Sequence, residues 1–313
     1  MEIKIGVDGG GSKTEIVALD QTGRVLRNLR KPASNYHLVG MEQATQNIIE
    51  GIRDALQEES VQGIGISLAG IDTPEDWKNM ADNLKGELLV LGQKTGVNFQ
   101  DIPVALENDV YGALMSVRGE FSGNVLAAGT GAVALGINPE GRVIRVGGWG
   151  HLIGDQGGGY DIGRKALVAM AASFDEYGPK SLLESTITKH LGLARVQEII
   201  DWLYQAKRTN KEVASLVPVV VETASRGDFI ARSILVEAGV GLGLLTRALL
   251  RKTKTLELGI VGGIGNIWGY IESSFNSTVS VEFPTLQILK PIYTPSVGAA
   301  LLSTIDQVRH IEF

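Results

Sequence analysis

The chain has 313 residues, of which 44 % are hydrophobic and 20 % charged, a composition typical of a globular protein with about two domains. Its net charge of −6 and the lack of a long basic stretch argue against nucleic acid as a partner, because phosphate backbones bind basic patches. The absence of cysteine excludes disulfides, thiolate nucleophiles and cysteine-bound iron–sulfur clusters. The start lacks a secretory signal and no apolar run of membrane-spanning length is free of charges, so we expect a cytoplasmic protein without a membrane partner.

The first 118 residues predict three strands followed by alternating helices and strands. Short apolar or alternating runs indicate the strands, and apolar residues at helical spacing indicate the helices. In chain order, the expected elements are strands at 3–8, 15–20 and 25–30, a helix over 41–58, a strand from Gly63, a helix capped by Thr73 with Pro74 in its first turn, a strand over 102–109 and a helix over 110–117.

The pattern then restarts at an offset of 118 residues. Gly23 corresponds to Gly141 (141 − 23 = 118), and the segment LDQTGRVLR aligns with INPEGRVIR. At the same offset, Ser12 aligns with Thr130 in a second glycine-rich loop. Chance similarity of two β-hairpins is the alternative, but two matching strand–loop–strand units favour an internal duplication.

The second half is more helical. We expect helices at 157–172, 181–191, 195–206 and 231–250, strands from Leu256 and Leu286, and a closing helix that begins at Pro295. The expected organisation is two α/β domains. The first comprises 1–118 and a C-terminal helix at 295–313, and the second comprises 119–294 with a helical insertion.

Both glycine-rich loops are candidates for phosphate binding, because exposed backbone N–H groups form anion-binding sites. The first does not fit a Walker A loop, since Ser12 precedes Lys13 and a strand follows. Neither loop opens a helix, so neither fits a dinucleotide-binding fingerprint. What remains is a pair of hairpin tips that hold one polyphosphate, with ordinary glycine turns as the alternative. The expected nucleotide-binding residues here are Gly10, Gly11, Ser12, Lys13, Thr14, Thr130 and Gly131.

Asp8 ends its strand directly before the first glycines. A carboxylate beside bound phosphates is suited to Mg²⁺, which prefers oxygen ligands. An aspartate before glycine can also simply stabilise a turn. Its place beside a phosphate loop favours the metal role.

Five motifs together resemble the BadF/BadG/BcrA/BcrD family, and within it the N-acetylglucosamine kinase branch. In order along almost the whole chain they are DGGGSKT, ENDVYGA, AAGTGAV, GGWGHLIGDQGGGYDIG and GIVGGIGN. The family is part of the actin-like, sugar-kinase and heat-shock ATPase superfamily. The resemblance implies an α/β fold of two duplicated RNase H-like domains with ATP and sugar in a cleft between them.

A sugar hydroxyl that attacks the γ-phosphoryl group must lose a proton, and a carboxylate can accept it. Asp109, between a strand and a helix, matches the general base of the family. It could instead only cap the helix. Glu107 is the fallback candidate for the base.

The resemblance also assigns the sugar and adenine contacts. Asn35 matches the sugar-binding asparagine of the family, and an aromatic ring with a carboxylate suits the faces and hydroxyls of a sugar. The expected substrate-binding residues are Asn35, Asp109, Gly131, Trp149, Gly150 and Asp155, and Gly262 and Gly263 are expected against adenine and ribose. Core packing is the alternative for Trp149, and His151 is expected to be structural. The sequence departs from the family motifs at Ala132, Gln156 and Gly158.

The expected activity is ATP- and Mg²⁺-dependent phosphorylation of N-acetylglucosamine at its 6-hydroxyl. Glucosamine and N-acetylmuramic acid are alternative acceptors. A sugar-independent ATPase and a non-catalytic sensor are alternative functions, although the cysteine-dependent activators of this family are excluded. The partner is a small-molecule amino sugar, and a homodimer is left open as the assembly.

Overall fold

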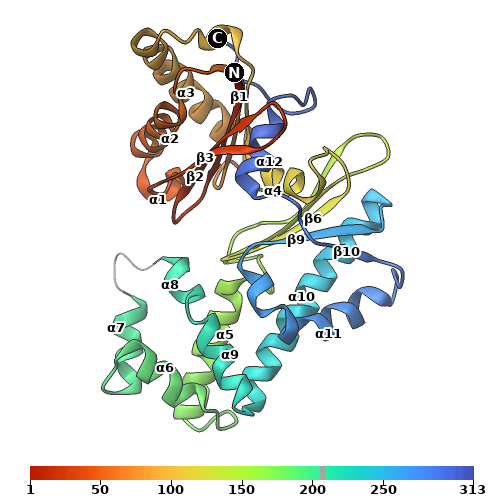
Figure 1. Ribbon diagram of the computed structural model, residues 1–313. Helices are drawn as coiled ribbons and strands as arrows, with labels where there is room; N and C mark the ends of the chain where they lie inside the picture. The colour runs from red at the N-terminus through yellow and green to blue at the C-terminus, as the bar shows by residue number, and fades with distance from the viewer. Residues whose placement is uncertain (205–208) are drawn as a thin grey trace. The chain divides into compact units, whose positions relative to one another are not determined.

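The computed structural model describes residues 1–204 and 209–313 (Figure 1). The chain forms two compact units. Unit 1 comprises Met1–Ser122 and Lys290–Phe313, and unit 2 comprises Gly123–Leu289. These boundaries lie a few residues from the expected ones at 118 and 295.

A five-stranded mixed sheet forms the centre of unit 1. Its strands are β1 (Glu2–Gly9), β2 (Thr14–Asp20), β3 (Val25–Lys31), β4 (Ser60–Leu68) and β5 (Val104–Asn108). The order is β3-β2-β1-β4-β5, with antiparallel pairing among the first three strands of the chain and parallel pairing of β1 with β4 and of β4 with β5. The carboxyl ends of β1, β4 and β5 therefore meet at one edge.

Helices cover both faces of this sheet. They are α1 (Tyr36–Val39), α2 (Met41–Ala55), α3 (Pro74–Thr95), a 3₁₀ turn at Phe99–Asp101, α4 (Asp109–Arg118) and α12 (Pro295–Leu302). On one face, the core between the sheet and helices α2 and α3 contains Ile5, Ile48 and Leu84. On the other face, Val17 of β2 packs against Val297 of α12. The predicted start of α3 is confirmed, since Thr73 and Asp76 form a reciprocal capping box.

Unit 2 repeats the sheet of unit 1. Its strands are β6 (Asn124–Ala128), β7 (Ala132–Ile137), β8 (Val143–Gly147), β9 (Glu257–Val261) and β10 (Gln287–Leu289), in the order β10-β9-β6-β7-β8. Read from the other end, this is the strand order of unit 1. Thr14 and Ala132, which begin β2 and β7, are 118 residues apart (132 − 14), as are the first residues of β3 and β8 (143 − 25). The common topology confirms the predicted duplication.

The helical insertion of unit 2 lies between β8 and β9. It comprises α5 (Gly159–Phe174), α6 (Leu183–Leu191), a 3₁₀ turn at Val196–Glu198, α7 (Ile199–Leu203), α8 (Asn210–Ala214), α9 (Val217–Ser225) and α10 (Phe229–Thr253). A further 3₁₀ turn (Gly263–Ile267) and α11 (Trp268–Ser280) follow β9. The single helix expected over 195–206 is instead a 3₁₀ turn followed by α7, and its last two residues lie outside the described part of the chain.

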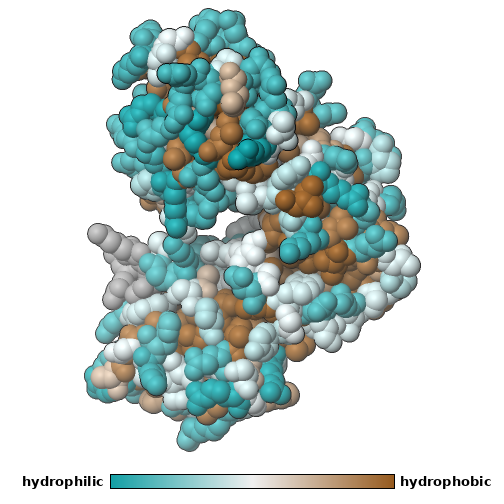
Figure 2. Space-filling model, in the orientation of Figure 1, coloured by the Kyte–Doolittle hydropathy of each residue, from teal (hydrophilic) through white to brown (hydrophobic). Residues whose placement is uncertain are grey.

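The longest helix of unit 2, α10, is apolar enough and long enough to cross a membrane by composition alone. Half of that stretch is buried inside the protein, which is equally typical of a core helix. Figure 2 shows that hydrophobic residues gather on the visible face of unit 2, whereas the visible face of unit 1 is mostly hydrophilic.

The end of the chain differs from the expected helix over 295–313. Helix α12 stops at Leu302, and turns follow until His310, which forms an antiparallel bridge with Ala105 of β5. The last residues therefore lie along the outer edge of the unit 1 sheet.

Helix α12 rests directly on the backbone of the sheet because glycines face it. Gly6 of β1 pairs with Gly65 of β4, so these two residues form a row without side chains. A Cβ atom built on Gly65 would lie 1.7 Å from the carbonyl oxygen of Ala299, and one on Gly6 would lie 2.0 Å from that of Ser296. No real side chain fits at such distances, so this packing requires glycine at both positions.

We expect Gly65→Ala to lower the free energy of unfolding by about 3 kcal/mol or more, because the added methyl group must push α12 off the sheet. Gly86→Ala is the matched control. A Cβ there meets no atom within 4 Å on the exposed side of α3, so this variant should gain up to about 1 kcal/mol. Urea denaturation measures both values, and equal effects of the two variants would contradict the packing argument.

Candidate functional site

Two carboxylates lie at the carboxyl edge of the unit 1 sheet. Asp8 is near the end of β1 and aligns across the sheet with Ser67 of β4, which aligns with Glu107 of β5. Asp109 follows β5 directly as the first residue of α4. Asn108 is the cap of this helix, since its side chain accepts a hydrogen bond from the backbone N–H of Val110. Capping therefore does not account for Asp109, which is partly buried at the helix N-terminus.

The pKa of Asp8 is raised from 3.8 to about 7, first by burial and then by the negative charges of Asp109 and Glu15, with Lys13 acting in the opposite direction. A cation bound here would relieve this repulsion. Mg²⁺ commonly uses one or two carboxylates and takes its other ligands from phosphates and water. Among the described residues no group of three or more acidic, histidine or cysteine side chains is suited to a metal. The site therefore fits Mg²⁺ held with a phosphate and does not fit an all-protein metal centre.

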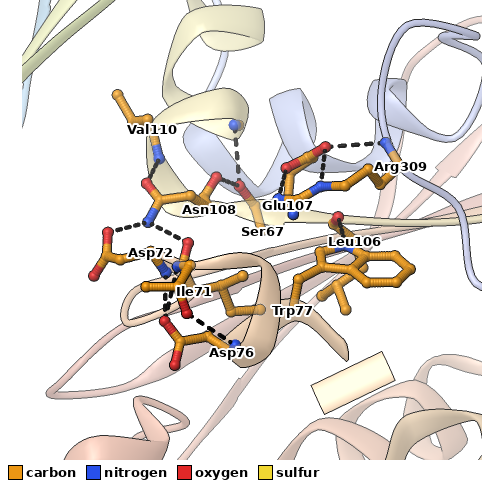
Figure 3. A network of polar contacts seen from close by, with 12 residues as sticks. Ser67, Ile71, Asp72, Asp76, Trp77, Leu106, Glu107, Asn108, Val110 and Arg309 are labelled. Carbon is orange, nitrogen blue, oxygen red and sulfur yellow. Dashed lines mark hydrogen bonds and ion pairs between the residues drawn. The ribbon is translucent and has the colours of Figure 1, made fainter. Parts of the chain in front are cut away.

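The carboxylate of Glu107, the fallback candidate for the base, is already bound by another residue of the protein. This carboxylate is buried and forms an ion pair with Arg309, which binds it through its guanidinium and its backbone N–H. Figure 3 shows Glu107 and Asn108 pointing in different directions from β5, as neighbouring strand residues do. A carboxylate held in this way is poorly suited to accept a proton from a substrate.

The β1–β2 loop forms a tight turn in which the backbone N–H of Gly10 donates to the carbonyl of Lys13 at 3.0 Å. The carbonyl oxygen of Gly10 in turn accepts from the N–H groups of Ser34 and Asn35. Gly11 and Ser12 are exposed at the tip, as a phosphate loop requires.

Two side chains of this loop are used within the protein. Lys13 forms an ion pair with Glu15 and remains partly exposed. Thr14 differs from the expectation, because its hydroxyl is fully buried and hydrogen-bonds with the Pro32 carbonyl and the Ser34 hydroxyl. The side chain of Thr14 therefore stabilises the loop from the inside and is not presented as a phosphate donor.

Asn35 caps the short helix α1, where its side-chain oxygen accepts from the backbone N–H of His37. The imidazole of His37 hydrogen-bonds with the carbonyl of Gly70 at 3.1 Å, which ties α1 to the loop after β4. Asn35 is thus held at the same edge of the sheet as the carboxyl ends of the parallel strands.

The corresponding loop of unit 2, between β6 and β7, is attached to the start of α5. The carbonyls of Gly129 and Thr130 accept from the N–H groups of Gly159 and Tyr160, at 2.8 and 2.9 Å. The side chain of Thr130 is exposed. This loop therefore has an exposed tip on a fixed base, as the loop of unit 1 does.

Asp155 lies against this loop and has a left-handed backbone conformation with φ 60°. Its Oδ1 accepts from the N–H of Ala132 at 3.3 Å, and a Cβ on Gly131 would lie 2.5 Å from its Oδ2. The structure thus brings Gly131 and Asp155 together. Gly158 also approaches Gly131 closely, since a Cβ on it would lie 2.8 Å from the Gly131 carbonyl carbon, so the departure from the family motif at this position permits tight packing.

Trp149 is 75 % exposed, which excludes the core-packing alternative for this residue. Gly150 beside it is exposed as well. His151 has the expected structural role, since it hydrogen-bonds with Asn210 and packs edge-on against Tyr160.

The two glycines after β9 have different roles. Gly262 has φ 97°, and a Cβ on it would lie 2.4 Å from the Ala128 carbonyl oxygen, so only glycine fits there. Gly263 is exposed and a Cβ on it would meet nothing within 4 Å. The backbone at Gly263 is therefore open to a flat ligand.

Several residues that shape the site were missed from sequence. Asn108 and Ser67 hold the junction of β5 and α4, since the Ser67 hydroxyl donates to the Asn108 carbonyl and accepts from the N–H of Gly112. Asp161 accepts from the N–H of Gly157 and so fixes the glycine loop before α5. The role of Asn108 could have been predicted, because an asparagine directly before a helix is a common N-cap. Arg309 had no local signal, because it lies 202 residues from Glu107.

The family profile described as the BadF/BadG/BcrA/BcrD ATPase family matches residues 5–303. An N-acetyl-D-glucosamine kinase from Dictyostelium discoideum is 35 % identical, with 96 % of this chain and 98 % of the relative covered. An N-acetylmuramic acid/N-acetylglucosamine kinase from Clostridium acetobutylicum is 33 % identical, with 97 % and 98 % covered.

Two solved structures share the fold over 96 % of this chain and 98 % of theirs. A candidate N-acetylglucosamine kinase from Chromobacterium violaceum has a TM-score of 0.76 at 24 % identity. A ROK family glucokinase from Streptomyces griseus, solved with glucose and AMPPNP, has a TM-score of 0.63 at 21 % identity. The predicted actin-like α/β fold class is confirmed.

The raised pKa of Asp8 makes a prediction for stability in metal-free buffer. Because the folded-state pKa is about 7 and the ordinary value 3.8, the folded chain binds the extra proton between these values, and stability falls as the pH rises through this window. Asp8→Asn removes the charge, so we expect it to be more stable than the parent at pH 8, by at most about 4 kcal/mol. The difference should fall to about 1 kcal/mol near pH 4.5 and vanish only below the ordinary pKa of 3.8. Denaturation at both pH values with EDTA measures it, and a gain that is equal at both would rule out the electrostatic origin.

Proposed function

Because the chain belongs to the BadF/BadG/BcrA/BcrD ATPase family, we propose that it is an ATP-dependent kinase of N-acetylated amino sugars, with N-acetylglucosamine phosphorylated at its 6-hydroxyl. The observation that carries the proposal is the pair of carboxylates, Asp8 and Asp109, at the end of parallel strands. Phosphoryl transfer to an alcohol can use such a pair, with one carboxylate for the metal and one for the proton of the acceptor hydroxyl. Both relatives described above are N-acetylglucosamine kinases by name, one of them also for N-acetylmuramic acid.

In this proposal Asp109 accepts the proton of the sugar hydroxyl as that oxygen attacks the γ-phosphorus. It lies at the N-terminus of α4, the end of the helix at which the helix dipole is favourable to negative charge. Asp8 would hold Mg²⁺, which neutralises phosphate charge when bound. Metal binding requires ionised Asp8, so the raised pKa gives proton release when the metal binds.

We assign ATP to the glycine loops. In unit 1, Gly10, Gly11, Ser12 and Lys13 would bind phosphate through backbone N–H groups and through the lysine charge. The backbone of Thr14 belongs to this loop, although its hydroxyl is buried. In unit 2, Thr130 and Gly131 would bind phosphate, and Gly262 and Gly263 would lie against adenine and ribose.

We assign the sugar to polar groups that are already held in place. Asn35, Asp155 and the backbone at Gly131 and Gly150 would bind sugar hydroxyls. The exposed ring of Trp149 would cover an apolar face of the sugar. The side chains of Asn35 and Asp155 are already positioned by hydrogen bonds within their own units, so little of their ordering entropy is lost on binding.

The acceptor has two alternatives. The Clostridium acetobutylicum relative is an N-acetylmuramic acid/N-acetylglucosamine kinase, which makes N-acetylmuramic acid the main competitor, ahead of glucosamine. A sugar-independent ATPase or a sensor without turnover are the other candidates from the same family and fold. We place the protein in the cytoplasm, where ATP is available, and leave a homodimer as the alternative to a monomer.

A panel of sugars with ATP and Mg²⁺ in a coupled ADP-release assay tests the proposal. We expect ADP release with N-acetylglucosamine, and the phosphorylated carbon is identified by NMR of the product. Release of ADP without sugar would indicate an ATPase, and sugar binding without ADP would indicate a sensor. A higher kcat/KM for N-acetylmuramic acid or glucosamine would replace the proposed acceptor.

We expect Asp109→Asn to fold normally and to lower kcat by roughly 10²- to 10⁴-fold, because an amide keeps the shape but cannot accept the proton. Asp82→Asn on the exposed surface of α3 is the control, with unchanged turnover expected. Near-parental kcat in Asp109→Asn would remove this residue from the mechanism.

A further inference from the structure

The last residues of the chain extend the unit 1 sheet beyond its edge strand β5. The N–H of Ile311 donates to the carbonyl of Val104 at 2.8 Å, and the N–H of Leu106 donates to the carbonyl of Arg309 at 3.0 Å. With the bridge between His310 and Ala105, these bonds place the tail antiparallel to β5. The tail is thus paired with the strand that leads into Asp109.

One side chain of the tail reaches the end of that strand. The backbone N–H and the Nε of Arg309 donate to Oε1 of Glu107 at 2.9 and 3.1 Å, and a terminal guanidinium nitrogen binds Oε2. The side chain of Glu107 is 3 % exposed and that of Arg309 43 % exposed. Both carboxylate oxygens are therefore bound by a single residue.

The arginine is itself held in position by α3. Its guanidinium carbon lies 5.3 Å from the ring centroid of Trp77, and the indole N–H of Trp77 donates to the Leu106 carbonyl at 2.7 Å. Figure 3 shows the ring beside Arg309 and next to Leu106. Trp77 thus contacts both the tail and β5.

The backbone on either side of Asp109 is bound by neighbouring elements. Before it, the backbone carbonyl of Asn108 accepts from Ser67, and the side-chain amide of Asn108 donates to the Ile71 carbonyl and to the Asp72 carboxylate. After it, the N–H of Gly112 donates to the same Ser67 hydroxyl. Glu107, in the same stretch, is a buried charge whose ion-pair partner comes from the far end of the chain.

We propose that Arg309 is a positioning residue for Asp109, acting through the buried carboxylate of Glu107. This inference rests on the proposed role of Asp109 as the base. A buried carboxylate that loses its partner moves toward water or recruits another cation, because an uncompensated buried charge is strongly unfavourable. Glu107 lies two residues before Asp109, so such a shift would displace the base from the acceptor hydroxyl.

The ion pair between Arg27 and Glu59 provides a matched control. It also joins a guanidinium to both oxygens of one glutamate, at 2.8 and 3.0 Å, but it involves β3 at the opposite edge of the same sheet. The comparison uses the full-length chain as Arg309→Gln, Glu107→Gln/Arg309→Gln and Arg27→Gln. Each variant is assayed for kcat and KM well below its melting temperature, and hydrogen exchange is followed for the peptide 104–112.

For Arg309→Gln we expect kcat to fall about 10- to 100-fold with the sugar KM within about threefold, since a misplaced base affects the chemical step more than binding. Exchange in 104–112 should become faster. The double variant removes both charges and should recover kcat to within about fivefold of the parent. Arg27→Gln should keep kcat within about twofold and leave exchange in 104–112 unchanged.

Unchanged kcat in Arg309→Gln, or a loss no larger than that of Arg27→Gln, would overturn the inference. So would a double variant as inactive as Arg309→Gln, because the effect would then come from lost packing and not from the unpaired charge. If the parent protein shows no sugar-dependent ADP release, the proposed function fails. In that case, hydrogen exchange in the peptide 104–112 still tests whether Arg309 positions Asp109. Unaltered exchange in Arg309→Gln would refute it.

Discussion

The direct contact between α12 and the backbone of the unit 1 sheet is the constraint on which that unit depends. It exists because Gly6 and Gly65 leave a row without side chains, on which the carbonyls of Ser296 and Ala299 lie. Through this contact, the last part of the chain, which follows unit 2 in the sequence, packs against the sheet formed by the first part. It also determines where the tail after Leu302 runs, and with it the position of Arg309 beside β5.

The chemistry of unit 1 is concentrated where the parallel strands end. Asp8 and Asp109 repel each other there, and the pKa of Asp8 rises to about 7 through burial and this repulsion. Such an arrangement is unfavourable for the free chain and favourable once a cation is bound. Local rules of stability are commonly broken where a protein binds its ligands, and this edge follows that pattern.

Residues proposed to bind the sugar also hold the scaffold. Asn35 caps α1, and Asp155 accepts a hydrogen bond from the strand that follows the second glycine loop. A structural role and a binding role therefore do not exclude each other at these positions. The structural contacts fix the orientation in which each polar group would meet a ligand.

The sequence alone determined the features that depend on neighbouring residues. These include the strand–glycine loop–strand units repeated at an offset of 118, the helix start at Thr73, and Asp109 between a strand and a helix. Alternation, helical spacing and turn chemistry are local, and so is the motif set that indicated the family.

Only the tertiary structure decided which polar groups are available. Thr14 carries the right chemistry for a phosphate loop, but a hydroxyl and a carbonyl from a neighbouring segment bury it. Glu107 is two residues from Asp109, but Arg309 from the end of the chain holds its carboxylate. For Trp149 the sequence left core packing open as an alternative, and the structure shows the residue exposed. These outcomes depend on packing between segments far apart in sequence, which residue type and spacing do not encode.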